Sequence, residues 1–260
     1  MEYSPKIGLT MRLELETRRF YLGRDYCEAL QHFGAIPFHI GLIPVEKYIS
    51  EALKNLDGIL LPGSDTDIDP FYFGEEPHAK LKKVIPEKDQ TDLMVLDYAE
   101  KLKIPVLAIC FGAQALNVHR GGTLIQDIET QVENFIRHEQ GKPLERNSHS
   151  LIFEKESKIM GLITTKDVNN NLRVNSHHHQ SIKSVGKNLR ATAWAKDSVI
   201  ECIEDTRNDR FVIGVQWHPE LSWKTDSFSE NIFKVFVKEC RNYAESNKGK
   251  TWEETSTTAG

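Results

Sequence analysis

The 260-residue chain has few cysteines and no long apolar run, and both absences limit what it can be. No apolar segment approaches the ~18 residues that a membrane-spanning helix requires. The first residues lack the charged and apolar regions of a signal peptide. The four cysteines are far apart and form no C-x-x-C pair: Cys27, Cys110, Cys202 and Cys240. This spacing is typical of reduced thiols, so we expect a cytoplasmic protein.

A strong excess of one charge is also absent. The chain has 33 Lys and Arg against 38 Asp and Glu, a formal net charge of −5. Such a balance gives no reason to expect a nucleic acid or an anionic membrane as partner. The sequence does not define the oligomeric state, and a homodimer stays open. Without internal repeats, we expect one domain over residues 1–245. Residues 246–260 are of low complexity and predict a flexible tail.

The most informative stretch surrounds Cys110. The apolar run 106–109 predicts a fully buried strand, and residues 113–119 are compatible with a helix. A cysteine between a buried strand and a helix sits on a sharp turn, with the helix N-terminus aimed at its sulfur. The helix dipole and free N–H groups there favour the thiolate. Gly112 removes a side chain that would keep strand and helix apart. A buried core cysteine remains the alternative on this stretch alone.

A second motif favours the catalytic alternative. The apolar run 211–217 predicts another strand, which leads directly into His218, Pro219 and Glu220. We expect His218 and Glu220 to project from the same face of an extended segment, because they are two residues apart. A carboxylate beside an imidazole can hold its tautomer and support the imidazolium that forms when a thiol gives up its proton.

The order of elements predicts an α/β fold. Short apolar runs alternate with helical stretches, which is typical of parallel βαβ units in a three-layer sandwich with a central, mostly parallel sheet. The expected strands and helices of this part are 6–11, 21–33, 35–40, 45–53, 58–61 and 89–102. A small antiparallel extension is expected over 148–153, 189–195 and 199–204, and a closing helix over 228–243. The carboxyl ends of parallel strands form the site in such sheets.

Together these motifs resemble a known superfamily. Ala108-Ile-Cys-Phe-Gly-Ala-Gln114 and Gly214-Val-Gln-Trp-His-Pro-Glu220 are similar to the class I glutamine amidotransferases. Three further motifs resemble its γ-glutamyl-γ-aminobutyrate hydrolase type, the Peptidase C26-like enzymes. They are Leu61-Pro-Gly-Ser-Asp65 with its following loop, Asn117 to Asp127, and Val174-Asn-Ser-His-His-His-Gln180. The resemblance covers roughly residues 6–240 and implies a flavodoxin-like sheet.

The resemblance also implies roles for individual residues. Cys110, His218 and Glu220 would form the catalytic triad. The backbone N–H groups of Gly63 and Phe111 would form the oxyanion hole, where one donor is typically worth ~100-fold or more in rate. Substrate contacts are expected from six side chains: Gln114, Ser64, Asp65, Asn175, Ser176 and His178. No cofactor is expected, since a thiolate carries the chemistry.

Two residues depart from the pattern of the subgroup. Phe111 stands where Arg is common, and Ser64 stands where a second Gly is usual. The Phe111 side chain either faces the pocket, and then disfavours a leaving amine that bears a carboxylate, or fills the core behind the turn.

Two patterns suggest a metal at first sight, and neither fits one. Asp65-x-Asp67-x-Asp69 begins like a calcium loop, but Pro70 occupies the position where such a loop needs Gly. The three adjacent histidines 177–179 cannot all face one ion from a regular segment. We therefore predict no metal site.

The sequence predicts a cysteine amidohydrolase that cleaves a γ-glutamyl amide through a γ-glutamyl thioester. The leaving amine stays open among γ-aminobutyrate, a polyamine and an amino acid, and the resemblance implies polyamine degradation. One alternative is a glutaminase subunit that supplies ammonia to a synthetase partner. Another is a non-catalytic binding protein on the same fold, which we would expect to have lost Cys110, His218 or Glu220.

Overall fold

The computed structural model describes residues 3–164 and 172–247. The strands are β1 (Lys6–Thr10), β2 (Arg12–Leu13), β3 (Phe20–Tyr21), β4 (Ile36–Ile40), β5 (Gly58–Leu61), β6 (Val106–Ile109), β7 (Thr123–Ile125), β8 (His149–Ser150), β9 (Ile152–Phe153), β10 (Arg173–Val174), β11 (Ser181–Ser184), β12 (Leu189–Trp194), β13 (Ile200–Asp205) and β14 (Val212–Val215). The α-helices are α1 (Arg24–His32), α2 (Glu46–Leu53), α3 (Pro86–Leu102), α4 (Phe111–His119), α5 (Ile128–Gln131) and α7 (Ser227–Ser246). Short 3₁₀ helices are η1 (Pro70–Phe73), η2 (Met160–Leu162) and η3 (Pro219–Leu221).

One large sheet organises the molecule. Its strands follow the order β4-β1-β5-β6-β14-β13-β11-β7, and β12 and β9 continue from β13. The pairs from β4 through β14 are parallel, whereas β13 and the strands beyond it pair antiparallel. β6 and β14, which precede Cys110 and His218, are neighbours in register, with Ile109 opposite Val215. The two sequence motifs therefore end at the same edge of the sheet.

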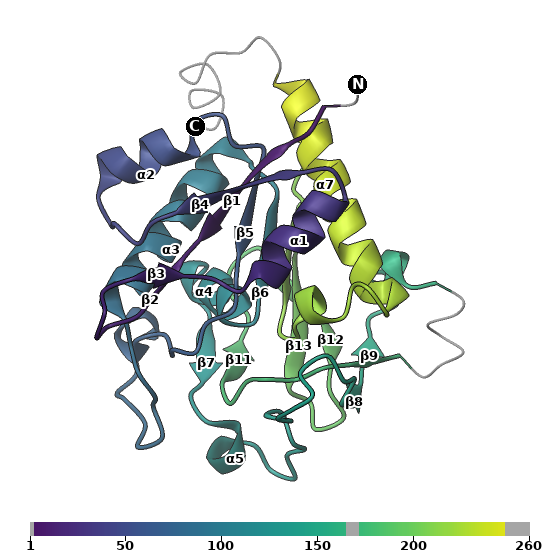
Figure 1. Cartoon of the computed structure of the whole chain (residues 1–260). Helices are drawn as coiled ribbons and strands as arrows, with labels where there is room; N and C mark the ends of the chain where they lie inside the picture. The colour runs from purple at the N-terminus through teal and green to yellow at the C-terminus, as the bar shows by residue number, and fades with distance from the viewer. Residues whose placement is uncertain (1–2, 165–171, 248–260) are drawn as a thin grey trace.

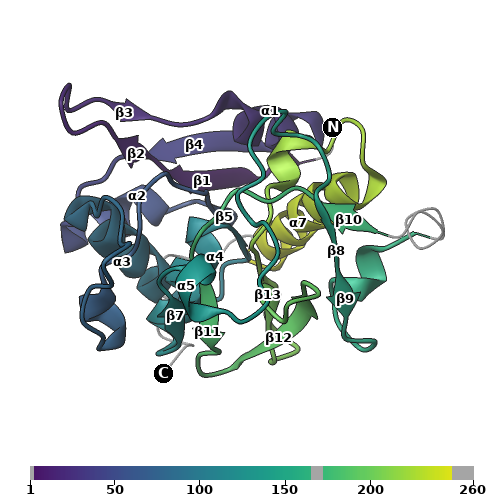
Figure 2. The same cartoon turned by 90° about the horizontal axis from the view of Figure 1, so that it is seen from below.

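Helices cover both faces of the parallel part. Figures 1 and 2 show α2, α3 and α4 on one side of the sheet and α1 and α7 on the other. Each strand contributes side chains to the apolar cores on both faces of the sheet, because successive residues point to opposite faces. In β5, Ile59 and Leu61 pack with the α2–α4 side, and Leu60 packs with α1 and α7. This explains why the central strands are apolar throughout, as expected of a sheet that is covered twice.

The predicted three-layer α/β fold is confirmed, and most expected elements are present. β5 and β6 have the predicted bounds, whereas α3 begins three residues early, at Pro86, where proline suits the first helical turn. The expected strand 148–153 is wrong, because β8 and β9 are separate and pair with different strands. The predicted tail lies almost wholly outside the described residues.

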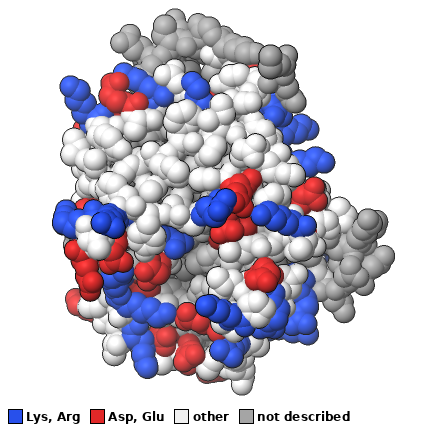
Figure 3. Space-filling view, viewed as in Figure 1, with Lys and Arg blue, Asp and Glu red and all other residues white. Residues whose placement is uncertain are grey.

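The described surface carries mixed charges. Figure 3 shows Lys and Arg interspersed with Asp and Glu, without a continuous field of one sign on the face that it displays. Within residues 3–164 and 172–247, no helix has both the length and the apolar character needed to cross a bilayer.

A buried ion pair ties α3 to the sheet below Cys110. Lys88 and Asp92 on α3 are 1% and 0% exposed at their side chains and form a short contact. Lys88 Nζ also donates to Thr10 Oγ1 of β1 at 3.2 Å. Burial lowers the pKa of Lys88 and raises that of Asp92, so each charge depends on its partner. The Lys88 ammonium lies 4.9 Å from the centre of the Phe111 ring.

We expect Asp92→Ala to destabilise the protein by about 3–5 kcal/mol, because it leaves a buried ammonium unpaired. The matched control is Glu51→Ala, which removes the exposed Lys54–Glu51 pair and should cost less than about 1 kcal/mol. Urea unfolding measures the destabilisation of both variants as a shift of the transition midpoint, provided that the dependence of the unfolding free energy on urea stays the same. Replacing both partners, Lys88→Met with Asp92→Leu, should recover much of the loss. If Asp92→Ala and Glu51→Ala lowered the free energy of unfolding equally, the buried pair would have no special role in stability.

Candidate active site

Cys110 occupies a strained turn between β6 and α4. Its φ of 52° and ψ of −108° are unusual for a residue with a side chain, and its N–H donates to the Val215 carbonyl at 2.7 Å. Such conformations cost ~1–3 kcal/mol and persist only where the surroundings impose them. Cys110 caps α4 directly, so the helix dipole acts on its sulfur. This is the geometry of a nucleophile elbow.

Gly112 allows the turn to close. A Cβ at this position would lie 2.3 Å from the Leu61 carbonyl oxygen and 2.7 Å from the Leu61 Cβ. Because the first of these atoms belongs to the backbone of β5, no side-chain adjustment could relieve the clash. The first turn of α4 therefore packs directly against β5, whereas the sequence suggested close packing against the strand that precedes Cys110.

His218 and Glu220 form a buried pair. His218 Nδ1 and Glu220 Oε1 lie 2.6 Å apart. The local geometry differs from the expectation of an extended segment, because β14 ends at Val215 and residues 219–221 form η3. His218 caps this single turn, and the tight turn, not a strand, brings its ring to the carboxylate two residues on.

Cys110 lies next to this histidine. A Cβ on Gly63 would meet His218 Cε1 at 2.8 Å and Cys110 Cβ at 3.4 Å, so the three residues adjoin one another. Burial lowers the pKa of His218, but Glu220 and then Cys110 more than offset it and raise the pKa to about 10. His218 Nε2 is buried and makes no hydrogen bond of ordinary geometry with a described residue. The imidazole is thus held by Glu220 on one side and faces the sulfur with its other nitrogen.

Asn175 fixes the backbone of the histidine. Its Oδ1 accepts from the His218 N–H and its Nδ2 donates to the His218 carbonyl, both at 2.8 Å. Since both ends of the amide are engaged, the structure gives Asn175 a positioning contact. Its expected contact with substrate stays a prediction.

The Gly63 peptides are held by two side chains that the sequence did not indicate. We expected the Gly63 N–H to face a substrate carbonyl, but it donates to the Tyr26 hydroxyl at 3.1 Å. The Gly63 carbonyl accepts from Arg12 Nε at 2.7 Å. This second contact orients the peptide plane that ends in the Ser64 N–H, which points opposite to the carbonyl of a trans peptide. Tyr26 lies on α1 and Arg12 on β2, and no local sequence signal marks either contact.

A small pocket of about 140 Å³ opens beside Cys110. Four of the six expected substrate contacts line it, together with Cys110 and Phe111: Ser64, Asp65, Gln114 and His178. Asn175 and Ser176 are buried and are not part of its lining. The volume equals that of about five water molecules at ~30 Å³ each, so the pocket suits a small head group. A macromolecular substrate could reach Cys110 only through a narrow terminal group.

Phe111 packs mainly into the core. The residue is 1% exposed, belongs to the apolar cluster between the sheet and α2–α4, and its ring lies against Lys88. The core-filling alternative is therefore the better description. As the first residue of α4, Phe111 has an N–H without an intrahelical acceptor.

The side chains of the two metal-like patterns make separate contacts. Asp65 accepts from the Tyr21 hydroxyl, Asp67 contacts His179, and Asp69 caps η1. Of the three adjacent histidines, His177 contacts the Leu144 carbonyl and His179 contacts Asp67, whereas His178 turns into the protein.

Comparison with known proteins places the chain among hydrolases of one family. The Peptidase C26 family model matches residues 6–220. Protein YvdE of Lactococcus lactis, provisionally named glutamine amidotransferase-like, is 36% identical over 222 residues, which are 84% of this chain and 88% of that protein. The γ-glutamyl-γ-aminobutyrate hydrolase PuuD of Escherichia coli K12 is 31% identical over 251 residues, 92% of this chain and 95% of PuuD.

A solved structure supports the fold independently. A Thermoplasma acidophilum protein, provisionally described as one subunit of GMP synthase, superposes with a TM-score of 0.65 at 18% identity. The superposition covers 95% of this chain and all of that one.

The thiols should differ in reactivity, and all four are free. Iodoacetamide should label Cys110 first, because it lies at the helix N-terminus beside a charged histidine and lines a pocket. Cys202 and Cys240 are buried, and burial raises the pKa of both well above the usual range. Half-buried Cys27 is the internal control, since burial raises its pKa too. Time-resolved peptide mapping measures the order, and faster labelling of Cys27 would contradict the proposed activation of Cys110.

Proposed function

Because this chain belongs to the Peptidase C26 family of glutamine amidotransferase-like hydrolases, we propose that it cleaves a γ-glutamyl amide into glutamate and an amine. The observation that carries the proposal is the placement of Cys110 on a strained elbow beside the His218–Glu220 pair. A core cysteine needs neither a strained backbone nor a buried, carboxylate-bound imidazole. The same observation argues against a non-catalytic binding protein.

In the first half of the reaction, the Cys110 sulfur attacks the γ-carbonyl carbon. Its proton resides on His218, and the π electrons of the carbonyl move to oxygen. As this tetrahedral intermediate collapses, the C–N bond breaks and His218 gives its proton to the departing amine. A γ-glutamyl thioester remains on Cys110, while Glu220 stabilises the imidazolium before the transfer.

In the second half, water takes the place of the amine. Neutral His218 accepts a proton from water as the oxygen attacks the thioester carbon. Collapse of the second intermediate breaks the C–S bond and returns Cys110 to its starting state with a protonated His218. The sum is amide plus water giving glutamate plus amine, so no cofactor enters the balance.

The backbone supplies the oxyanion donors in this proposal. The Phe111 N–H is free at the start of α4, and the Arg12 contact turns the Ser64 N–H away from the held Gly63 carbonyl. We therefore assign the second donor to Ser64 in place of Gly63, whose N–H is engaged by Tyr26. Such donors stabilise the transition state strongly because their orientation is set before the reaction.

Pocket size and polarity support a γ-glutamyl head group. Gln114 Nε2 donates to the Gln180 carbonyl and to Gln216 Oε1, which leaves the Gln114 carbonyl oxygen to accept from a substrate ammonium. The leaving amine would extend outward past Asp65 and Lys82, which offer one negative and one positive side chain. γ-Aminobutyrate is the first candidate, by similarity to PuuD, and polyamines are the second.

The nucleophile is tested by Cys110→Ala, which should lower turnover of γ-glutamyl-γ-aminobutyrate by about 10⁴-fold or more while the melting temperature changes little. Cys27→Ala is the matched control, because it removes a thiol outside the pocket and should retain activity. Activity that survives in Cys110→Ala would refute the assignment.

The substrate class is tested with the wild-type chain alone. Initial rates on γ-glutamyl-γ-aminobutyrate, a γ-glutamyl polyamine and free glutamine should show a higher kcat/KM for the γ-glutamyl amines. A chain that hydrolyses only glutamine, and only after a synthetase is added, would support the ammonia-supplying alternative instead.

The pH profile tests the pairing of His218 with Glu220. Protonated His218 is needed to expel the amine, so kcat/KM should fall as pH rises through about 10. Glu220→Gln removes the largest influence that raises this pKa, and the falling limb should therefore move to lower pH as kcat decreases. The exposed Glu230→Gln on α7 serves as the control and should leave the limb in place. An unchanged limb in Glu220→Gln would show that another group sets it.

A further inference from the structure

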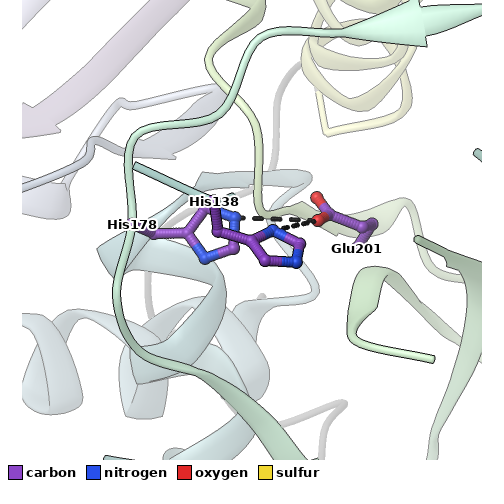
Figure 4. Close-up of side chains that lie close together, drawn as sticks. All are labelled: His138, His178 and Glu201. Atoms are coloured by element: carbon purple, nitrogen blue, oxygen red, sulfur yellow. Dashed lines mark ion pairs between the residues drawn. The ribbon is translucent and has the colours of Figure 1, made fainter. Parts of the chain in front are cut away.

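Behind the wall of the pocket, three buried histidines converge on one carboxylate. Glu201 of β13 is 1% exposed, and a single oxygen, Oε1, lies 3.3 Å from His138 Nδ1, 3.3 Å from His149 Nε2 and 3.6 Å from His178 Nε2. The ligand atoms of His138, His178 and Glu201 all lie within 4.8 Å of one another. Figure 4 shows the rings of His138 and His178 directed at the carboxylate from different segments of the chain.

The far nitrogens of these rings are already engaged. His138 Nε2 lies 2.9 Å from Asp197 Oδ2, and His178 Nδ1 lies 2.9 Å from the Gln180 carbonyl. His149 Nδ1 contacts the carbonyl of the next residue at 3.4 Å. Since these acceptors require N–H groups, neutral His149 and His178 rings present a bare lone pair to Glu201. His138 Nδ1 also lies 3.4 Å from Ser176 Oγ, a contact that a bound ion would replace. A carboxylate or carbonyl behind each imidazole is the usual support of a metal-binding histidine.

Hydrogen bonding does not account for the centre of the cluster. Both Glu201 oxygens, His149 Nε2 and His178 Nε2 are buried without a hydrogen bond of ordinary geometry to any described residue. Charge-assisted N–H···O bonds are ~2.7–2.9 Å long, shorter than the distances seen here. Ligands held tetrahedrally at ~2.0–2.1 Å from a zinc ion lie about 3.3–3.4 Å apart. The contacts of Oε1 with His138 and His178, 3.3 Å and 3.6 Å, are close to this spacing, and the ligand atoms of these three residues lie within 4.8 Å of one another.

We propose that His138, His178 and Glu201 bind one divalent transition-metal ion of the zinc class. Imidazoles and a carboxylate suit zinc, whereas calcium and magnesium prefer oxygen ligands. His149 Nε2 contacts Glu201 Oε1 and supports the carboxylate. The ion joins the segments that carry His138 and His178 to β13.

The site also supports the pocket beside Cys110. His178 lines that pocket, and the Gln180 carbonyl that holds His178 also accepts from Gln114 at 3.1 Å. On the other side, His149 lines a larger cavity of about 1090 Å³. The ion therefore sits in the wall between two cavities, and its binding fixes the backbone against which Gln114 is positioned.

The experiment measures metal binding to the full-length chain without an activity assay. Chelator-treated wild-type protein should bind one zinc ion per chain in mass-spectrometric metal analysis, and zinc should raise its melting temperature. Cobalt bound in its place should give the visible absorption of a tetrahedral site. Substoichiometric binding together with an unchanged melting temperature would overturn the proposal, whatever the variants do.

Variants locate the ion. The supporting change Asp197→Asn should weaken zinc binding ~10–100-fold, and His178→Ala or Glu201→Gln should weaken it further. His39→Ala is the matched control, because Cys27 and His39 lie 3.3 Å apart and are a second place with two soft ligands. If a folded Glu201→Gln chain still binds zinc tightly, or if His39→Ala loses zinc binding, the metal lies at another site. If a ligand variant does not fold, the wild-type cobalt spectrum and the Asp197→Asn titration still decide.

Discussion

The contact between the start of α4 and strand β5 is the constraint on which the site depends. With no side chain at Gly112, the helix lies against the Leu61 backbone, and the chain must turn abruptly at the residue before it. The strain at Cys110 is offset by the packing of α4 and by the bond from its N–H to β14. Below the turn, Phe111 rests on Lys88, whose charge is balanced by Asp92. The position of the Cys110 sulfur therefore depends on the packing of the sheet with both α3 and α4.

The site also depends on the seam where parallel pairing gives way to antiparallel pairing. β14 is parallel to β6 on one side and antiparallel to β13 on the other. The parallel side supplies Cys110, the proposed nucleophile, and β14 leads into His218. Asn175, which follows β10 of a separate two-stranded sheet, holds the backbone of His218. Glu201 lies on β13 at the same seam. β14 therefore lies between the strand that leads to Cys110 and the strand that carries Glu201.

Sequence reasoning succeeded where local patterns decide the structure. Buried apolar runs located β5 and β6, and Gly112 after Cys110 indicated the turn. It failed where contacts join distant segments: Tyr26 and Arg12 reach Gly63 across the fold, and nothing in their neighbourhoods indicates it. The histidine triplet was weighed only against its sequence neighbours, whereas the partners of His178 lie in two other segments. The turn at η3 was missed because His-Pro-Glu was treated as a continuation of the strand.

The insertion of β14 between β6 and β13 has a consequence during synthesis. Residues 212–215 form the neighbour of the strand that leads to Cys110, and His218 follows them, so the chain through His218 must leave the ribosome before the two residues can meet. Contacts so distant in sequence form late. A nascent chain that ends earlier carries the thiol without the imidazole that would accept its proton. In the proposed mechanism, a growing chain therefore becomes active toward amides only when β14 and the residues after it have joined the sheet.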